Sequence, residues 1–270
     1  MAGIEHNVSG HTEQSDAPPW HISVLQHLNP VGRDLFENYS KVPSDNVIEH
    51  ITIFRDKAFK VYPYPCLGRW GFLDFSICQS ASYAEVLDRV KTGQKCLDVG
   101  CCFGQDIRKL VHDGAPSENM YGCDLRKDFM EIGYDLFLDK RTLKTTFVAA
   151  DIFEANSDLR KFDGQFNIVH AASFFHLFDW DCQVLAAKNV AALLKPGPGS
   201  LIVGRQAGNV ISGPGKGNIF VHDCGSFIKL WKQVGEETKT KWNVEAQFTE
   251  DVLGFAPPGT RWLAFTVRKL

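Results

Sequence analysis

Length, composition and charge already exclude several classes of protein. The chain has 270 residues, of which 44% are hydrophobic and 23% are charged, and its formal net charge is −3. A chain of this length can bury a full core without disulfides or a structural metal. The near balance of 29 basic and 32 acidic residues gives no strong electrostatic footprint for nucleic acid. No run of 18 apolar residues is present, so no membrane partner is expected.

The N-terminal residues lack the features of a targeting signal. They read MAGIEHNVSGHTEQSDAPP, with neither the basic region nor the apolar core of a signal peptide. Residues 1–20 are polar and rich in small side chains, which predicts a disordered tail. The eight cysteines form no C-x-x-C pair, and several stand in apolar runs, so we interpret them as free thiols. These observations together predict a cytoplasmic location.

Residues 21–92 show an interrupted helical pattern. Between Pro43 and Pro63 apolar side chains recur at helical spacing, and proline then ends the helix because it removes an amide donor. The next residues, 66–80, are aromatic and irregular, and a further helix is expected over 83–90. We expect this region to form a helical cap that serves as a lid over the substrate.

From residue 93 onward, strand-like runs alternate with helical ones. The helical segments carry apolar residues on one face, and glycine, proline or polar residues separate the elements. This alternation predicts an α/β fold with a parallel sheet. Two later runs joined by a short Gly/Pro loop, 242–248 and 260–267, predict an antiparallel hairpin at the sheet edge. The five expected parallel strands span 95–99, 120–123, 146–150, 166–171 and 200–204.

The sharpest local signal is the run CLDVGCCFGQD at residues 96–106. A buried strand enters glycines and then a helix start, where free amides and the helix dipole favour a polar ligand. Asp124 and Asp151 follow the next two strands, at the carboxyl ends where parallel sheets place ligands. An acid in the position of Asp124 accepts hydrogen bonds from ribose hydroxyls in such folds, which predicts a nucleotide-like ligand.

The spacing D-x-G-x-x-x-G from Asp98 to Gly104 resembles motif I of class I S-adenosylmethionine-dependent methyltransferases. That family commonly has a glycine where this chain has Cys102, and a dinucleotide fingerprint would need glycines that Cys102 and Gln105 replace. The resemblance implies S-adenosylmethionine as cofactor and a Rossmann-like sheet of seven strands with the last one antiparallel. It assigns the methyltransferase domain to residues 93–270. The cofactor-binding residues that it implies are Asp98, Gly100, Gly104, Asp124, Leu125, Asp151, Ile152 and Ala171.

A closer likeness extends from about residue 26 to residue 250. The segments YPYPCLGRWGFLDFS, YDLFLDK and HAASFFHLFDW are similar to fungal meroterpenoid-pathway methyltransferases. This resemblance, and not the spacing, implies methyl ester formation on a carboxyl group of a prenylated aromatic polyketide. The expected partner is a small-molecule acid, and the formation of a homodimer is left open.

The expected acceptor site combines the aromatic cap with the loop after the fourth strand. His176 is the candidate catalytic residue, as a positioning group or a base, and a histidine packed for structural reasons is the alternative. His170 lies within the strand and is interpreted as structural. Arg69 could pair with a substrate carboxylate, although a solvated arginine is the alternative. No spaced histidines or clustered carboxylates in the sequence indicate a metal site. The aromatic substrate-binding candidates are Tyr64, Trp70 and Phe175.

Other functions stay open on the sequence alone. The acceptor atom could be a hydroxyl oxygen or a carbon of another small molecule. A phenol, with a pKa near 10, is only about 0.1% ionised at pH 7 and would need a base, whereas a carboxylic acid would not. Less favoured are an NAD(P)-dependent oxidoreductase on a related fold and a cofactor-binding protein without catalysis.

Overall fold

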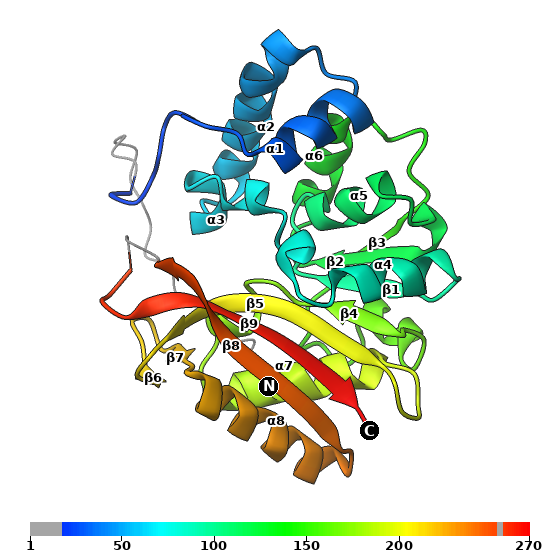
Figure 1. Ribbon diagram of the computed structural model, residues 1–270, viewed down its shortest axis with the longest axis vertical. Helices are drawn as coiled ribbons and strands as arrows, with labels where there is room; N and C mark the ends of the chain where they lie inside the picture. The colour runs from blue at the N-terminus through cyan, green and yellow to red at the C-terminus, as the bar shows by residue number, and fades with distance from the viewer. Residues whose placement is uncertain (1–17, 253–255) are drawn as a thin grey trace.

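The computed structural model describes residues 18–252 and 256–270, which are built around a seven-stranded sheet (Figure 1). The strand order is β3-β2-β1-β4-β5-β9-β8, with parallel neighbours from β3 to β5 and antiparallel pairing of β9 with both β5 and β8. The predicted seven-stranded sheet, with its antiparallel last strand in an edge hairpin, is confirmed. Its strands are β1 (Cys96–Val99), β2 (Met120–Asp124), β3 (Thr146–Ala149), β4 (Ile168–His170), β5 (Leu201–Asn209), β8 (Trp242–Val252) and β9 (Thr260–Lys269).

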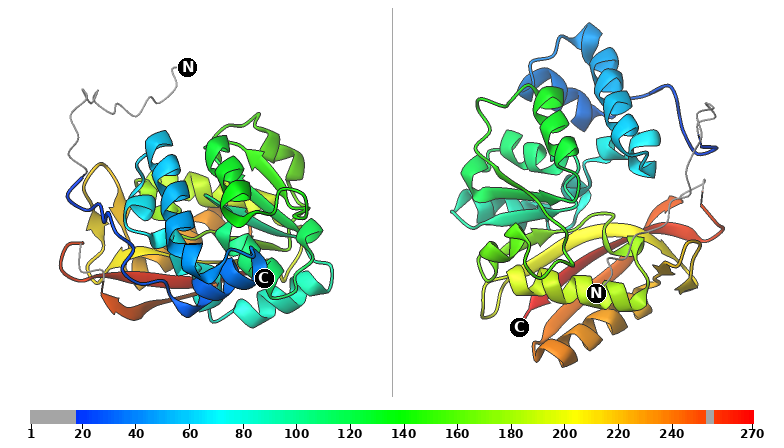
Figure 2. Two further views of the ribbon diagram at one scale, coloured as in Figure 1. Left: turned by 90° about the horizontal axis from the view of Figure 1, so that it is seen from above. Right: turned by 180° about the vertical axis from the view of Figure 1, so that it is seen from behind.

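Helices cover both faces of this sheet (Figures 1 and 2). One face packs against α4 (Tyr83–Lys91), α5 (Gln105–His112) and α6 (Lys127–Phe137). The other packs against α7 (Trp180–Leu193) and α8 (Cys224–Thr238). Burial on both faces explains why the central strands read as continuous apolar runs and not as alternating ones. Smaller elements are η5 (Ser117–Asn119), η6 (Asp158–Phe162), η7 (Phe175–Leu177), β6 (Gly213–Pro214) and β7 (Phe220–Val221).

A helical cap precedes the sheet domain and packs on α6 (Figure 1). Its longest helix, α2 (Val47–Val61), lies against α6, and the ring of Phe36 stacks on that of Phe137 at 5.2 Å between centroids. The aromatic stretch that follows α2 forms short turns because prolines and left-handed residues interrupt it. The other cap elements are α1 (Pro30–Asp34), η1 (Leu35–Tyr39), η2 (Ser44–Asn46), α3 (Pro65–Gly68), η3 (Gly71–Asp74) and η4 (Ser76–Gln79).

Two strands differ in length from their predicted spans. The fourth strand begins only at Ile168, because Phe166 forms no more than an isolated bridge with Leu194. The fifth continues to Asn209, since its pairing with β9 extends to Thr260. Both differences arise from partners distant in the chain, which a local sequence pattern does not contain.

Three other expectations can be compared with the structure. The predicted disordered tail falls mostly on residues 1–17, outside the described residues, and Trp20 at its end packs edge-on against Phe59. All eight cysteines are free thiols, as predicted. Among the helices of the described residues, none has both the length and the apolar character needed to cross a bilayer.

A buried ion pair joins the cap, α5 and the chain after α6. Arg108 donates through Nε and Nη2 to the carboxylate of Asp139 at 2.7 and 2.9 Å, and both side chains are buried. The hydroxyl of Tyr39 in the cap donates to the same carboxylate at 2.7 Å. Arg108 also donates to the carbonyls of Phe103 and Gly104, in the turn that follows β1. One guanidinium therefore fixes that turn and the cap together, and its two-pronged geometry gives the contact a defined orientation.

Candidate functional site

The turn after β1 brings the main chain to the surface at the carboxyl end of the sheet. The N–H groups of Gly100 and Cys101 donate to the carbonyl of Cys123 on β2, at 2.8 and 3.0 Å. Gly100 is exposed, although Val99 and Cys101 on either side are each only 1% exposed. Its φ of +72° suits glycine, and an added Cβ would lie 3.2 Å from the ring of Phe174. A ligand can therefore approach the backbone closely at Gly100.

Cys102 occupies the place where the related motif commonly has glycine. Its φ of +52° is left-handed, which costs a non-glycine residue about 1–2 kcal/mol. Its side chain is buried in the apolar cluster of the cap, together with Leu67, Trp70 and Phe103. Packing of the Cys102 side chain in this cluster therefore offsets the cost of its left-handed backbone conformation.

Asp124, at the end of β2, is tied into the same turn. Its Oδ2 accepts the N–H of Cys102 at 2.8 Å, and its Oδ1 accepts the N–H of Arg126 at 2.9 Å. Burial raises the pKa of Asp124, while these two N–H groups act in the opposite direction. Each carboxylate oxygen keeps a further lone pair, so the group can still accept hydrogen bonds from ligand hydroxyls.

Two cap tyrosines lie beside this carboxylate. The rings of Tyr62 and Tyr64 are 4.4 Å apart, and the Arg126 guanidinium lies 4.8 Å from the Tyr62 ring centre. Burial, together with the nearby charge of Asp124, raises the pKa of Tyr64, so its phenol stays protonated at neutral pH. The cap therefore supplies an aromatic wall at this end of the site.

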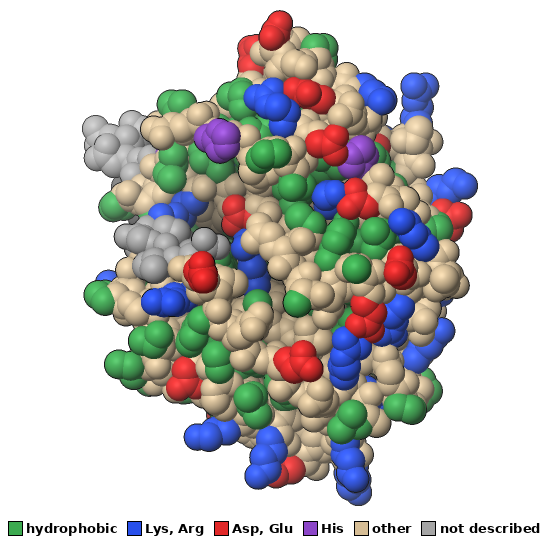
Figure 3. Space-filling view, in the orientation of Figure 1, with side chains coloured by type: hydrophobic (Ala, Val, Ile, Leu, Met, Phe, Trp, Pro, Cys, Tyr) green, Lys and Arg blue, Asp and Glu red, His purple; other side chains and the backbone are tan. Residues whose placement is uncertain are grey.

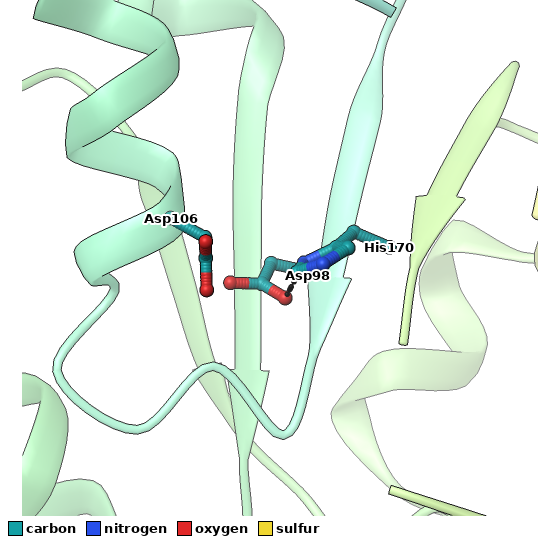
Figure 4. Close-up of side chains that lie close together, drawn as sticks. All are labelled: Asp98, Asp106 and His170. Carbon is teal, nitrogen blue, oxygen red and sulfur yellow. Dashed lines mark hydrogen bonds and ion pairs between the residues drawn. The ribbon is translucent and has the colours of Figure 1, made fainter. Parts of the chain in front are cut away.

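Asp98 on β1 pairs with a histidine on the neighbouring strand. Asp98 and His170 are register partners, and Oδ1 of Asp98 lies 2.8 Å from Nδ1 of His170 (Figure 4). The other carboxylate oxygen, Oδ2, is buried and has no hydrogen-bond partner among the described residues. Asp106 of α5 lies nearby, so three potential metal ligands come within 4.8 Å of one another, a grouping that the sequence did not predict.

Of the remaining predicted cofactor residues, Gly104 is buried at the start of α5, and the others follow the ends of β2, β3 and β4. Leu125, directly after Asp124, is 57% exposed. Asp151 is half-buried, and its Oδ1 accepts the N–H of Phe153 at 2.9 Å. Ile152 and Ala171 are buried. The structure thus brings the predicted set to one edge of the sheet, as expected where parallel strands end together.

Comparison with known proteins identifies the family. A model described as the meroterpenoid methyltransferase N-terminal domain matches residues 20–73, and one described as a methyltransferase domain matches residues 96–197. The chain is 50% identical over 226 residues to the O-methyltransferase phiE of a fungus recorded as Fungal sp., covering 81% of this chain and 75% of that protein. It is 48% identical over 227 residues to the Asnovolin E/Chermesin D methyltransferase nvfJ of Aspergillus novofumigatus, covering 82% of each. The chain belongs to the fungal meroterpenoid methyltransferases.

A solved structure shares the fold of this methyltransferase at low sequence identity. The S-adenosylmethionine dependent methyltransferase of Mesorhizobium loti is 15% identical, with a TM-score of 0.50, over 71% of this chain and 99% of that one. Agreement at this level concerns the arrangement of helices and strands. The likeness therefore supports the class I methyltransferase sheet and not a particular acceptor.

The site of this methyltransferase fits S-adenosylmethionine, its methyl donor. The unpartnered Oδ2 of Asp98 offers a buried acceptor to the ammonium group at the amino-acid end of the cofactor. Gly100 leaves room that a Cβ would take up, and Asp124 offers acceptors to ribose hydroxyls. The cofactor carries no phosphate to repel these carboxylates. The chain is thus an S-adenosylmethionine-dependent methyltransferase of fungal meroterpenoid pathways.

The four residues of the methyltransferase that were predicted to bind the acceptor differ in their burial. Trp70 and Phe175 are packed in the cores: the Trp70 indole donates to the carbonyl of Ile22 at 3.0 Å, and Phe175 is fully buried. Tyr64 lies beside Asp124, as described above, and Arg69 is half-buried at the end of α3. Burial lowers the pKa of Arg69, which still leaves it charged at neutral pH. Tyr64 and Arg69 therefore stay candidates for substrate contact. Trp70 and Phe175 would support the residues of the site without touching the substrate.

His176, the candidate catalytic residue, lies on the short helix η7. Its Nδ1 is buried without a hydrogen-bond partner among the described residues, and burial lowers the pKa of His176 to about 4. The ring is therefore neutral at pH 7. A neutral imidazole with an open nitrogen can hold a substrate oxygen or an N–H, and it is a weak base.

Two contributions to the site were not expected from the sequence. Phe174, and not its neighbour Phe175, faces Gly100. His170, interpreted as structural, is bonded to a motif residue through its pairing with Asp98. Adjacent aromatic residues in a loop carry no periodicity that separates the inward ring from the outward one. The His170 contact needs the strand register, which local patterns do not contain.

Replacing the carboxylate of Asp124 tests the ribose end of the site. Asp124→Ala should weaken binding of S-adenosylhomocysteine by about 1–3 kcal/mol, because ribose hydroxyls lose their acceptor and the turn loses the bond to Cys102. Asp124→Asn keeps one acceptor oxygen, so its affinity for S-adenosylhomocysteine should lie between those of the unchanged protein and of Asp124→Ala. Isothermal titration calorimetry measures both, with the exposed Asp158→Asn as a control expected to bind normally. An unchanged dissociation constant for Asp124→Ala would remove this residue from the site.

Proposed function

We propose that this methyltransferase forms a methyl ester on a carboxyl group of a prenylated aromatic polyketide in fungal secondary metabolism. The observation that carries the proposal is the 50% identity to a protein named as an O-methyltransferase. A relative of similar identity is named for asnovolin E and chermesin D. The name of the first relative supports oxygen as the acceptor atom, and the meroterpenoid family model over residues 20–73 supports a terpenoid-bearing acceptor.

The apolar lining of the cap suits such a bulky acceptor. The cap cluster consists mostly of Phe and Leu side chains, with Tyr62 and Tyr64 packed against it. A recess between the cap and the edge of the sheet is visible in Figure 3, with both acidic and basic side chains on its walls. An apolar wall with a few polar groups is the usual lining of a small-molecule site. We assign the cap, residues 21–92, the role of a substrate lid over the methyltransferase domain at 93–270.

The ionisation of the acceptor distinguishes an acid from a phenol. His176, with a pKa of about 4, would face a proton transfer about 8 kcal/mol uphill if it took the proton of a phenol. A carboxylic acid is already ionised at pH 7 and needs no base. The low pKa of His176 therefore favours a carboxylate acceptor, for which the residue only has to hold and orient an oxygen.

The residues of the site then act mainly by positioning. When bound, S-adenosylmethionine supplies a methyl group on a cationic sulfur. Asp124 and the Gly100 backbone would hold its nucleoside, and the buried Asp98 carboxylate its amino-acid end. The aromatic cap would exclude water around the acceptor, and orientation of this kind lowers a barrier by on the order of 7–11 kcal/mol. Arg69 would steer the acceptor carboxylate through its charge.

The acceptor atom can be tested directly by comparing an acid with its ester. We expect the protein to convert a prenylated aromatic acid and S-adenosylmethionine into the methyl ester and S-adenosylhomocysteine, detected by mass spectrometry. The pre-formed methyl ester of the same acid should give no turnover, because its carboxyl oxygen is already methylated. Continued methylation of the ester would show that the acceptor is a hydroxyl or a carbon.

The role of His176 can be separated from that of a base. General-base catalysis typically contributes 10²–10⁴-fold, so His176→Asn should lower kcat by less than about tenfold if the residue only orients the acceptor. The pH profile between 6 and 8 should carry no step from this residue, since the depressed pKa keeps it neutral throughout. A loss of a hundredfold or more in steady-state kcat would identify His176 as the base.

A further inference from the structure

A chain of hydrogen bonds connects the cap to the sheet through Asp98, Asp106 and His170, which Figure 4 shows close together. His170 of β4 lies with Nδ1 2.8 Å from Oδ1 of Asp98, and its Nε2 lies 3.4 Å from Oγ of Ser76 in the cap. Ser76 donates its hydroxyl to Oδ2 of Asp106 at 3.3 Å, and the N–H of Ile77 donates to Oδ1 of Asp106 at 2.9 Å. Four elements, η4, β1, α5 and β4, thus meet in one hydrogen-bonded chain.

The hydrogen bonds that Asp98, Asp106 and His170 already make argue against metal binding by this cluster. Oδ1 of Asp98 faces Nδ1 of His170, and both oxygens of Asp106 accept hydrogen bonds from η4. Only Oδ2 of Asp98 has no partner among the described residues. A divalent cation binds four or more ligands, so it would have to break most of these bonds.

The three contacts made by His170 and Ser76 can all be hydrogen bonds at once in only one protonation state of His170. Ionised Asp98 and Asp106 can only accept, so Nδ1 of His170 must donate to Asp98, and the single hydrogen of Ser76 goes to Asp106. The Ser76 oxygen is then an acceptor for Nε2 of His170, which must also carry a hydrogen. Both ring nitrogens donate only in the imidazolium form.

The charges around the ring agree with this assignment. Burial lowers the pKa of His170 and Arg205 of β5 acts in the same direction, but the charges of Asp98 and Asp106 outweigh both, so the pKa is raised. Burial also raises the pKa of Asp98, while its pairing with His170 favours the ionised carboxylate. The ring is buried at 3% exposure, so the attraction of two carboxylates is weakly screened. Arg205 is itself occupied by Asp74 and Gln79 of the cap, at 2.6 and 2.7 Å.

We propose that His170 is a positioning residue that remains protonated and ties the cap to the cofactor edge, with Nδ1 holding Asp98 and Nε2 holding Ser76. The proposal rests on the lid role assigned to the cap under the proposed function. The cap turn η4 joins the preceding cap elements to α4, which packs on the sheet, so its attachment sets where the lid stands over the acceptor. Loss of the proton removes one donor, so Ser76 keeps only one of its two bonds, either to Nε2 of His170 or to Asp106, and the cap loses one hydrogen bond to the sheet domain.

This arrangement predicts a pH effect on acceptor binding of defined sign. A histidine with a raised pKa contributes below that pKa, and its contribution disappears as pH rises through it. The KM for the acid acceptor should therefore rise at alkaline pH, roughly two- to tenfold for one hydrogen bond, with kcat little changed. The acceptor carboxylate is ionised across this range and adds no step of its own.

Two variants distinguish loss of these hydrogen bonds from a general loss of cap stability. Ser76→Ala removes the bond to Nε2, so its KM should be raised at neutral pH and flat with pH, while its affinity for S-adenosylhomocysteine stays normal. His170→Asn keeps a donor for Asp98 but cannot reach Ser76 or titrate, so it should show the same raised, flat KM. Ser44→Ala, an exposed cap serine on η2, should behave as the unchanged protein. A normal, pH-dependent KM for Ser76→Ala would overturn the proposal.

The protonation state can be read without any turnover. Histidine labelled with ¹⁵N in the full chain, with His170→Asn to assign the signal, should show both His170 nitrogens protonated at pH 7, above the ordinary pKa of about 6.5. A neutral ring at pH 7 would contradict the proposal. If no acid acceptor is turned over but the imidazolium is observed, the proposed substrate class fails while the link between cap and sheet stands.

Discussion

The hydrogen bond from the Cys102 N–H to the Asp124 carboxylate is the contact on which the site depends. It joins the turn after β1 to the end of β2 at 2.8 Å, beside the two main-chain bonds that reach Cys123. Because of it, an exposed glycine backbone and a half-buried carboxylate face the same space. A nucleoside needs both at once: close approach to the main chain, and acceptors for its hydroxyls.

The cap is coupled to this turn from two sides. Arg108 bonds the turn carbonyls on one side and, through Asp139, the cap hydroxyl of Tyr39. On the other side, Asp106 in the first turn of α5 accepts bonds from η4. Buried, charge-assisted hydrogen bonds of this kind are directional and weakly screened. The position of the cap is therefore tied to the turn after β1 and to the start of α5.

Much of the sheet domain could be predicted because its signals are local. The run ending at Val99, the glycines after it and the acids Asp124 and Asp151 stand in a fixed order that parallel strands convert into one edge. The antiparallel hairpin of β8 and β9 could be predicted from two strand-like runs joined by a short loop. The long cap helix α2 could be predicted from apolar residues at helical spacing and from the proline that ends it. The meroterpenoid assignment came from the resemblance of longer segments and agrees with the family to which the chain belongs.

What could not be predicted depends on contacts between distant residues. Asp98 and His170 lie 72 residues apart and meet only through the register of β1 with β4. Trp70 and Phe175 were expected at the substrate and stay predictions, but their rings are packed in the cores, a distinction that irregular aromatic segments do not reveal. The length of β5 likewise depends on its pairing with β9.

A crystal structure with S-adenosylhomocysteine and an aromatic acid bound measures the central claim most directly. We predict ribose hydroxyls within hydrogen-bonding distance of Asp124, the nucleoside against the Gly100 backbone, and the acid beneath the cap with its carboxylate aimed at the sulfur. A nucleoside seated away from Asp124, or an acceptor bound outside the cap, would contradict the site described for this methyltransferase.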